Sequence, residues 1–483
     1  MKIAGMRDRL LATVAGATLL TASALVGGAP TASALAGAPA AGALAGGPAA
    51  APGTAHPGPR AAALARILRL GPGRAGRPGL GLAGLAGHGL RAQALPKGGR
   101  DLPEPGTASL LQGVSCLSSS DCWAVGTYNP GGDFDLNEVL HWNGSAWIQV
   151  PAPSPGGSAS GSLSLLISVR CAAVSDCWAV GVTERNGGAQ LNQALHWNGT
   201  KWSVKPTPQP GGSLSSDINE LFEVGCTSSA SCWAAGRYGT QAGGTVLLNQ
   251  LLHWNGKKWS LATVPNPGGT ESGDVNEVNA VRCTSAGNCL AAGSYGTTSL
   301  MVNEALHWNG ATWSQVSVPN PGGSTGTGTF NELDSLACSS ATNCWAVGFY
   351  GSLTTELRVN QALHWNGSAW TQVATPEPDG TGIGASQNLT GVACKTATNC
   401  WAVGSYASAS GAILDQALHW DGGAWTLVDT PEPGGGAVGD NNDLVTVRCN
   451  SSADCWAVGG AQMSGGQLFG QALHWNGTTW SIG

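Results

Sequence analysis

Cysteine and histidine are the reactive residue types that recur at regular spacing in this chain of 483 residues. Its 14 cysteines form pairs with five residues between the two members, and a histidine follows each pair in a Leu-His-Trp motif. Paired cysteines can close disulfides or bind zinc, and histidine can bind a metal or exchange protons near neutral pH. Which chemistry is open to the chain depends on which of these side chains meet in the fold.

The cysteine pairs favour local disulfides over zinc sites. An even number of cysteines in an exported chain is typical of disulfides. A zinc ion would instead need ligands from two or more pairs, and each pair lies in a separate repeat. We therefore expect seven bridges, each within one repeat: Cys116–Cys122, Cys171–Cys177, Cys226–Cys232, Cys283–Cys289, Cys338–Cys344, Cys394–Cys400 and Cys449–Cys455.

The histidines of the repeated motif are expected to be structural: His141, His196, His253, His307, His364, His419 and His474. One histidine at the same position of each repeat places the seven far apart, so we expect hydrogen bonds to neighbouring strands rather than a shared metal. The asparagine four residues earlier, as at Asn137 and Asn249, lies on the same strand face and is the candidate partner. We expect no cofactor. A structural calcium ion stays open, although no EF-hand or nonapeptide calcium pattern occurs.

The cysteine pairs also mark seven copies of one unit. The first cysteine recurs after 55, 55, 57, 55, 56 and 55 residues, a period within the range of propeller and kelch arrays. In the third copy the residue pattern predicts strands over 221–226, 232–238, 246–254 and 259–264. Asn255-Gly256 predicts a hairpin turn because both residues tolerate positive φ, and Pro265 ends the last strand.

Four short antiparallel strands in each of seven repeats predict an all-β fold, a seven-bladed β-propeller of four-stranded blades, over residues 107–483. A solenoid is the alternative, but it would need distinct terminal repeats, and the first and last copies resemble the middle ones. All 20 tryptophans lie at three positions of the repeat, and these positions hold tryptophan in every copy except at Leu290. We expect these rings to fill the space between neighbouring blades.

The order of a strand with Val-Gly, a loop, a strand, a turn and a Trp-containing strand resembles a kelch-type blade, as in the galactose-oxidase central domain. The pattern CWAVG…LHWNGxxW also resembles repeats of uncharacterised exported bacterial proteins. The glycine pair of kelch repeats is present only at Gly459-Gly460, and paired cysteines are not a kelch hallmark. The resemblance implies the propeller fold. The copper-radical chemistry of galactose oxidase needs a cysteine, whereas here every cysteine is expected to be paired.

The first hundred residues differ from the repeats. A basic start, an apolar run from Leu10 and small-residue cleavage sites predict a signal peptide over 1–34, and an uncleaved membrane anchor is the alternative. Residues 35–106, rich in Ala, Gly and Pro, predict a flexible linker. These features predict a secreted, extracellular protein.

Charge divides the chain in the same way. Residues 1–100 carry 11 basic groups and one acidic group, whereas the remainder carries 11 basic and 27 acidic groups, a net charge of −16. The acidic balance argues against nucleic acid as the partner of the repeat domain. The basic linker could contact an anionic cell envelope. We expect a monomer.

The variable loops carry the candidate site. The loops after the second and fourth strands of each repeat share one face and differ between copies, and variable loops on a rigid scaffold commonly bind ligands. All five tyrosines start the first of these loops, and arginines break the symmetry of that face. The candidate ligand-binding residues are Tyr238, Arg237, Tyr350, Arg358, Tyr128, Tyr295, Tyr406 and Arg185. Packing of the loop bases is the alternative role of the tyrosines.

No catalytic residues are predicted, because the sequence has no nucleophile elbow, no HExxH motif and no sialidase-type Asp-box. We expect an exported binding protein for a protein or glycan partner, not an enzyme. A secreted carbohydrate-active hydrolase or lyase with carboxylates at the ring mouth is one alternative. A structural envelope protein is the other.

Overall fold

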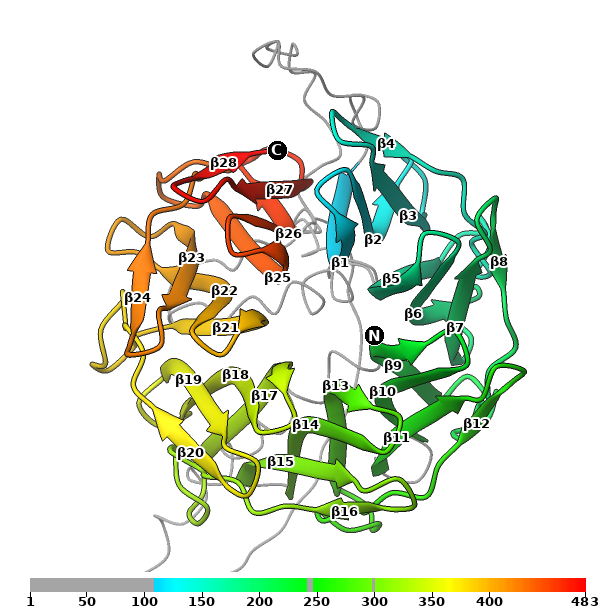
Figure 1. Cartoon of the computed structure of the whole chain (residues 1–483), viewed down its shortest axis with the longest axis horizontal. Coiled ribbons are helices and arrows are strands. Elements are labelled where there is room, and N and C mark those ends of the chain that lie inside the picture. Colours follow the sequence, from blue (N-terminus) through cyan, green and yellow to red (C-terminus); the bar gives the residue numbers. More distant parts are fainter. Residues whose placement is uncertain (1–107, 241–245, 298–299) are drawn as a thin grey trace, which may run out of the picture.

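The computed structural model describes residues 108–240, 246–297 and 300–483. These residues form 28 β-strands and no helix, so none of them belongs to a helix long and apolar enough to cross a membrane. The strands lie around a central axis, which is the architecture of a β-propeller (Figure 1). The predicted signal peptide (1–34) and linker (35–106) lie outside the described residues.

Each repeat has four antiparallel strands that run from the axis to the rim. In the third repeat these are β9 (Asp217–Ser228), β10 (Ser231–Thr240), β11 (Val246–Trp254) and β12 (Trp259–Leu261). The predicted order is therefore confirmed, with a longer inner strand and a shorter outer strand than expected. The Asn255-Gly256 turn is also present. Only the glycine has positive φ, 85°, while the Asn255 side chain accepts the N–H groups of the two lysines that follow.

The other repeats have the same four strands. The innermost strands are β1 (Ala108–Ser118), β5 (Ser162–Ala173), β13 (Val275–Ser285), β17 (Thr329–Ser340), β21 (Gln387–Thr396) and β25 (Asn441–Ser451). The second strands are β2 (Asp121–Asn129), β6 (Asp176–Glu184), β14 (Asn288–Thr297), β18 (Asn343–Ser352), β22 (Asn399–Ala407) and β26 (Asp454–Gln462). The third strands are β3 (Phe134–Trp142), β7 (Gln190–Trp197), β15 (Leu300–Trp308), β19 (Leu357–Trp365), β23 (Ile413–Trp420) and β27 (Phe469–Trp475). The outermost strands are β4 (Trp147–Gln149), β8 (Trp202–Val204), β16 (Trp313–Gln315), β20 (Trp370–Val373), β24 (Trp425–Val428) and β28 (Trp480–Ile482).

The prediction of a seven-bladed propeller with separate four-stranded blades is wrong for this structure. Backbone hydrogen bonds join the strands into three sheets of eight, twelve and eight strands, and none of these sheets closes on itself. The cause is a short parallel contact in which the start of an inner strand pairs with the start of the third strand of the preceding repeat. Examples are Leu247 with Val275 and Ile413 with Asn441. Two neighbouring repeats therefore share one hydrogen-bonded sheet wherever this contact forms.

The first and last repeats meet by packing and not by a shared sheet. The indole of Trp456 lies 4.8 Å from Trp142 and 5.1 Å from Trp147, measured between ring centroids. The Ser109 N–H also donates to the Leu468 carbonyl, at 3.1 Å. The repeats therefore form a complete ring. This boundary, here called the seam, has the same tryptophan contact as the other boundaries, except the one between the fourth and fifth repeats, where Leu290 replaces the second-strand tryptophan.

All seven predicted disulfides are confirmed, and each closes within one repeat between its innermost and second strands. The paired cysteines lie directly opposite each other in the strand register, for example Cys226 opposite Cys232. Seven disulfides fit an extracellular protein, because such bonds persist in oxidising surroundings.

The tryptophans fill the boundaries between repeats, as predicted. The second-strand indole packs between the third-strand and outer-strand indoles of the next repeat, as Trp345 does at 4.7 Å from Trp420 and 5.0 Å from Trp425. Leu290 occupies the same position in the fourth repeat, where it packs with Trp365 and Trp370. The indole of Trp365 is buried there, whereas its counterparts in the other repeats are only half-buried. The smaller leucine is therefore compensated by an inward position of the neighbouring indole.

Candidate functional site

Arg237, one of the predicted ligand-binding residues, is buried in an ion-pair network. Its Nε donates to Glu220 and its Nη1 donates to Glu277 of the next repeat, both at 2.7 Å. The side chain also covers the ring of Phe222, at 5.5 Å. The guanidinium therefore joins two repeats, and its predicted role in ligand binding has no support from its position.

The other predicted arginines lie on the loop face. Arg358 is half-buried, and its guanidinium covers the ring of Phe349 at 4.2 Å. Arg185 is exposed, and its Nε donates to the Pro155 carbonyl at 2.9 Å. Their role in ligand binding stays a prediction.

The five tyrosines Tyr128, Tyr238, Tyr295, Tyr350 and Tyr406 are half-buried at the ends of the second strands. The backbone of Gly322, in the loop before the fifth repeat, lies against the Tyr350 side chain. Burial raises the pKa of the phenols of Tyr238, Tyr350 and Tyr406. These positions fit packing of the loop bases, and ligand contact by the tyrosines stays a prediction.

The histidines bind a different partner from the one expected. Their Nε2 atoms pair with the residue just before the second cysteine, as in His307 with Asn288 at 2.7 Å and His196 with Asp176 at 2.7 Å. Outside the fourth repeat, which has Leu290 at this position, the imidazoles also pack on the second-strand indoles of their own repeats, with centroids 4.5 Å apart for His253 and Trp233. No group of three or more metal-ligating side chains is found in the described part of the chain. The prediction that each histidine pairs with the asparagine four residues before it is therefore wrong.

The asparagines instead connect neighbouring repeats in a belt of buried amides. The Nδ2 of Asn303 donates to the Pro319 carbonyl and to the Gln361 side chain of the next repeat, both at 2.7 Å. The belt is interrupted between the second and third repeats, where the Asn192 Oδ1 and the Gln250 side-chain amide have no hydrogen-bond partner among the described residues. It is interrupted again at the seam, where Gly470 replaces the asparagine. Glu138 has the repeat position that Gln361 has in the fifth repeat. Its Oε2 is buried without a hydrogen-bond partner among the described residues, and burial raises its pKa to about 8.

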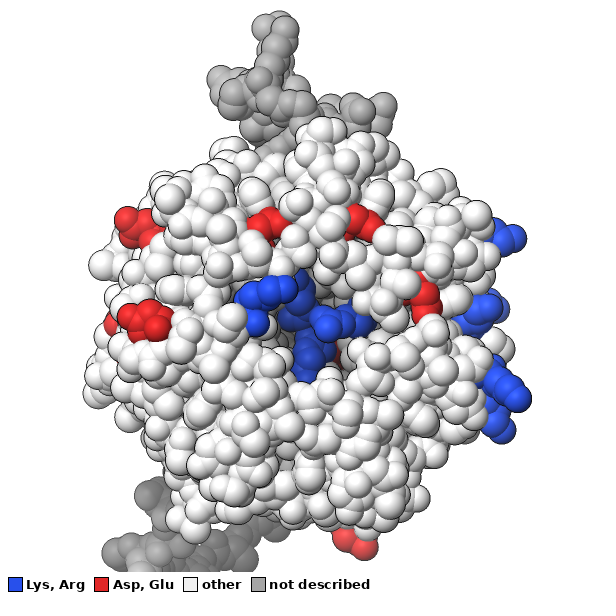
Figure 2. All heavy atoms as spheres, in the orientation of Figure 1, with Lys and Arg blue, Asp and Glu red and all other residues white. Residues whose placement is uncertain are grey.

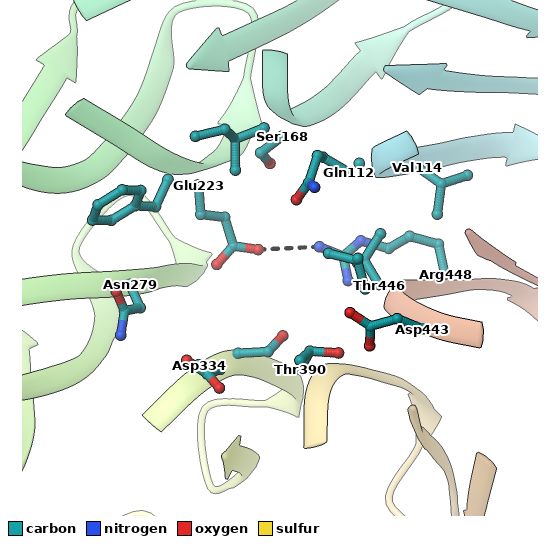
Figure 3. Close-up of a pocket in the computed structure, with 15 residues that line it drawn as sticks. Gln112, Val114, Ser168, Glu223, Asn279, Asp334, Thr390, Asp443, Thr446 and Arg448 are labelled. Carbon is teal, nitrogen blue, oxygen red and sulfur yellow. Dashed lines mark hydrogen bonds and ion pairs between the residues drawn. The ribbon is translucent and has the colours of Figure 1, made fainter. Parts of the chain in front are cut away.

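A polar cavity, here called the channel, lies between the innermost strands of all seven repeats (Figure 3). Every innermost strand has two irregularities in the strand register, one at its centre and one after the first cysteine. A bulge bends the strand and re-aims its side chain. The residues left unpaired by the central bulges all line the channel: Gln112, Ile167, Phe222, Asn279, Asp334, Thr390 and Val445.

Basic side chains gather in the central hollow of the face seen in Figure 2. Arg170, Arg282 and Arg448, which each precede the first cysteine of their repeat, lie together around Glu223 and are here called the arginine cluster. The Oε1 atom of Glu223 pairs with Nη2 of both Arg282 and Arg448, the latter at 3.1 Å. Burial, together with the nearby Arg282, lowers the pKa of Arg170 to about 10.

The channel also holds carboxylates. Asp334 and Asp443 come from the fifth and seventh repeats and both line the channel (Figure 3), together with amide, hydroxyl and aromatic groups. This mixture can hydrogen-bond a polar ligand and pack on its apolar parts.

Sequence reasoning missed the channel residues, although a signal exists. Core positions in a regular strand are two residues apart, whereas the buried Leu111 and Val114 are three apart. The same spacing recurs at Leu166 and Val169. A repeated three-residue step between core positions indicates a bulge, and the residue after the first core position is then the one aimed at the axis.

No model of a known protein family matches the sequence, and no curated protein is similar to it. Solved structures are similar only at low scores. A protein of unknown function from Dyadobacter fermentans has a TM-score of 0.42 and 12% identity, covering 79% of this chain and 96% of its own. A six-bladed fucose-binding lectin from Aleuria aurantia has a TM-score of 0.38 and 14% identity, covering 65% and 92%.

A GH74 xyloglucanase from Xanthomonas campestris has a TM-score of 0.34 and 12% identity, covering 77% of this chain and 60% of its own. These scores are too low to assign this chain to the family of any of them. The kelch-like resemblance therefore stays a prediction.

Proposed function

We propose that the protein is a non-catalytic binding protein that holds a glycan in its axial channel. The observation that carries the proposal is the variation at the bulge position. The core positions beside it, such as Leu221 and Val224 in the third repeat, keep the same residue type around the ring, whereas the bulge residue differs in all seven copies. A position with only a structural role would be expected to hold the same type of residue in every copy. An asymmetric ligand instead needs different contacts around the axis.

The groups in the channel suit a sugar. Amide and hydroxyl side chains such as Asn279 and Thr390 can bond to hydroxyl groups, and the half-buried Phe222 ring offers an apolar surface. Two polar atoms of the lining, Gln112 Nε2 and Asn279 Oδ1, are buried and have no hydrogen-bond partner among the described residues. Buried polar groups are normally paired, and a bound polyol would supply the missing partners.

The scaffold favours tight binding because it is rigid. Each bulge lies four residues before a disulfide-bonded cysteine, as Asn279 does before Cys283. Side chains that are already ordered lose less entropy when they bind a ligand.

A glycan array, followed by calorimetry on the best ligand, tests the proposal. We expect Asn279→Ala to weaken binding roughly tenfold or more, because a buried hydrogen bond is lost. Ser229→Ala, at an exposed a–b turn between the innermost and second strands, is the matched control and should bind like wild type. If Tyr238→Ala weakens binding while Asn279→Ala does not, the ligand lies on the loop face instead.

A glycan hydrolase is the second candidate, since Asp334 and Asp443 line the same channel. Glycoside hydrolysis commonly uses two carboxylates that flank the scissile bond. Chromatography of the bound glycan after long incubation distinguishes the two functions. Cleavage that Asp334→Asn and Asp443→Asn both abolish would establish the enzyme.

A further inference from the structure

We infer that the glycan carries an anionic group, a carboxylate or a sulfate, and that the arginine cluster at the end of the channel binds it. This inference rests on the proposed function, because it assigns the chemical class of the same ligand. It starts from three guanidinium groups gathered around one carboxylate. Arg282 and Arg448 pair with Glu223, and Arg170 is close enough to Arg282 and Glu223 for their charges to shift its pKa. The other carboxylates of the channel lining, Asp334 and Asp443, come from the innermost strands of the fifth and seventh repeats.

The cluster is not required by the repeat. At the position before the first cysteine, the other four repeats have the small residues Ser115, Gly225, Ala337 and Ala393. The strands around these residues have the same disulfides and the same cores. An arginine at this position therefore has no general structural purpose, and its occurrence in three repeats around one axis needs a separate reason.

The cluster also has donors to spare. A guanidinium has five N–H donors in a planar fork that matches carboxylate and sulfate oxygens. Arg448 uses Nη1 on the carbonyls of Val447 and Val392, at 2.9 and 3.3 Å, and Nη2 on Glu223 at 3.1 Å. Its Nε is buried and has no hydrogen-bond partner among the described residues.

The arginines disfavour one another in the absence of a further anion. Arg282 lowers the pKa of Arg170, while Glu223 acts in the opposite direction. Like charges that remain close in a poorly hydrated place are costly, and a second anion beside them would reduce that cost. Apart from Asp334 and Asp443, the remaining groups of the channel are uncharged, and they include both polar and apolar side chains. A saccharide with one acidic group can use both these groups and the arginine cluster.

The test compares oligogalacturonate with its methyl ester by calorimetry at constant ionic strength, with a sulfated dextran oligosaccharide and its unsulfated form as a second pair. We expect the acidic member of at least one pair to bind roughly tenfold or more tightly, as is typical of a charged hydrogen bond. Arg448→Gln and Arg170→Gln should each remove this preference. Lys258→Gln, an exposed charge on a c–d turn between the third and outermost strands, is the control. Which pair shows the preference distinguishes carboxylate from sulfate.

Equal binding of acidic and neutral members, unchanged in both arginine variants, would overturn the inference and leave the proposed function in place. If no saccharide binds, the proposed function fails, and inorganic sulfate then tests the cluster alone. Thermal stabilisation of wild type by sulfate that Arg448→Gln and Arg170→Gln lose would support an anion site. No stabilisation of wild type would refute it. Melting curves without ligand show whether each variant is folded.

Discussion

Replacing Trp345 with leucine tests whether the indole contacts between repeats hold the ring together. Trp345 is 1% exposed, and its ring centroid lies 4.7 Å from Trp420, 5.0 Å from Trp425 and 4.8 Å from His364. Truncating a buried tryptophan to alanine typically costs about 3–5 kcal/mol, and each aromatic pair contributes about 0.5–1.5 kcal/mol beyond burial. Leucine retains part of the apolar contact. We therefore expect Trp345→Leu to lower the free energy of unfolding by about 2–4 kcal/mol.

Urea denaturation with the disulfides intact, followed by circular dichroism, measures this change through the midpoint at constant m-value. Trp345→Phe should lower the free energy of unfolding by less than Trp345→Leu, because phenylalanine keeps an aromatic ring between the two repeats. The fourth repeat provides the reverse experiment. Leu290→Trp should destabilise the protein by about 1–3 kcal/mol through overpacking, since the buried indole of Trp365 already lies beside Leu290. A loss below about 0.5 kcal/mol for Trp345→Leu, the range of surface changes, would refute the reasoning, as would stabilisation by Leu290→Trp.

Three further outcomes follow from the contacts. In the wild-type protein the stability should fall as the pH rises from the unfolded pKa of Glu138, 4.5, through its folded pKa of about 8, because the folded state holds the extra proton. Glu138→Gln should flatten this pH dependence. Urea midpoints across that pH range measure the effect, and an unchanged slope would contradict it. Arg237→Ala should destabilise by about 3–5 kcal/mol because buried carboxylates lose their partner, whereas a calorimetric loss of glycan affinity with an unchanged melting temperature would show a binding role. Replacing both Cys283 and Cys289 with alanine should cost about 2 kcal/mol in the chain-entropy model, measured by urea midpoint, and no loss would show that the short loop is already ordered in the unfolded chain.

The sequence by itself determined the repeated unit and its local chemistry. The paired cysteines, the Asn-Gly turn and the three tryptophan positions each depend on residues close together in the chain, so their consequences could be derived copy by copy. The disulfide Cys226–Cys232, the strand β11 (Val246–Trp254) and the packing of Trp233 between repeats were predicted in this way.

Only the tertiary structure decided how the repeats are joined and which side chains meet. Whether the hydrogen-bonded sheet continues from one repeat to the next depends on a single pair of residues, such as Leu247 and Val275. No periodic pattern in the sequence reveals such a pair. The partner of Arg237 was also not evident from the sequence. The sequence suggested an exposed charge on a loop, whereas in the structure Arg237 is paired with Glu277, 40 residues away.

The axial site shows most clearly what could not be predicted from the sequence. Arg170, Arg282 and Arg448 are spread over 279 residues of sequence, and only the ring brings them to one axis. The bulges that aim Asn279 and Asp334 into the channel leave a weak trace in the spacing of core residues. The physical reason is that local patterns report which face of a strand is buried, whereas a site on the axis is formed by repeats that contact one another only after the ring has closed.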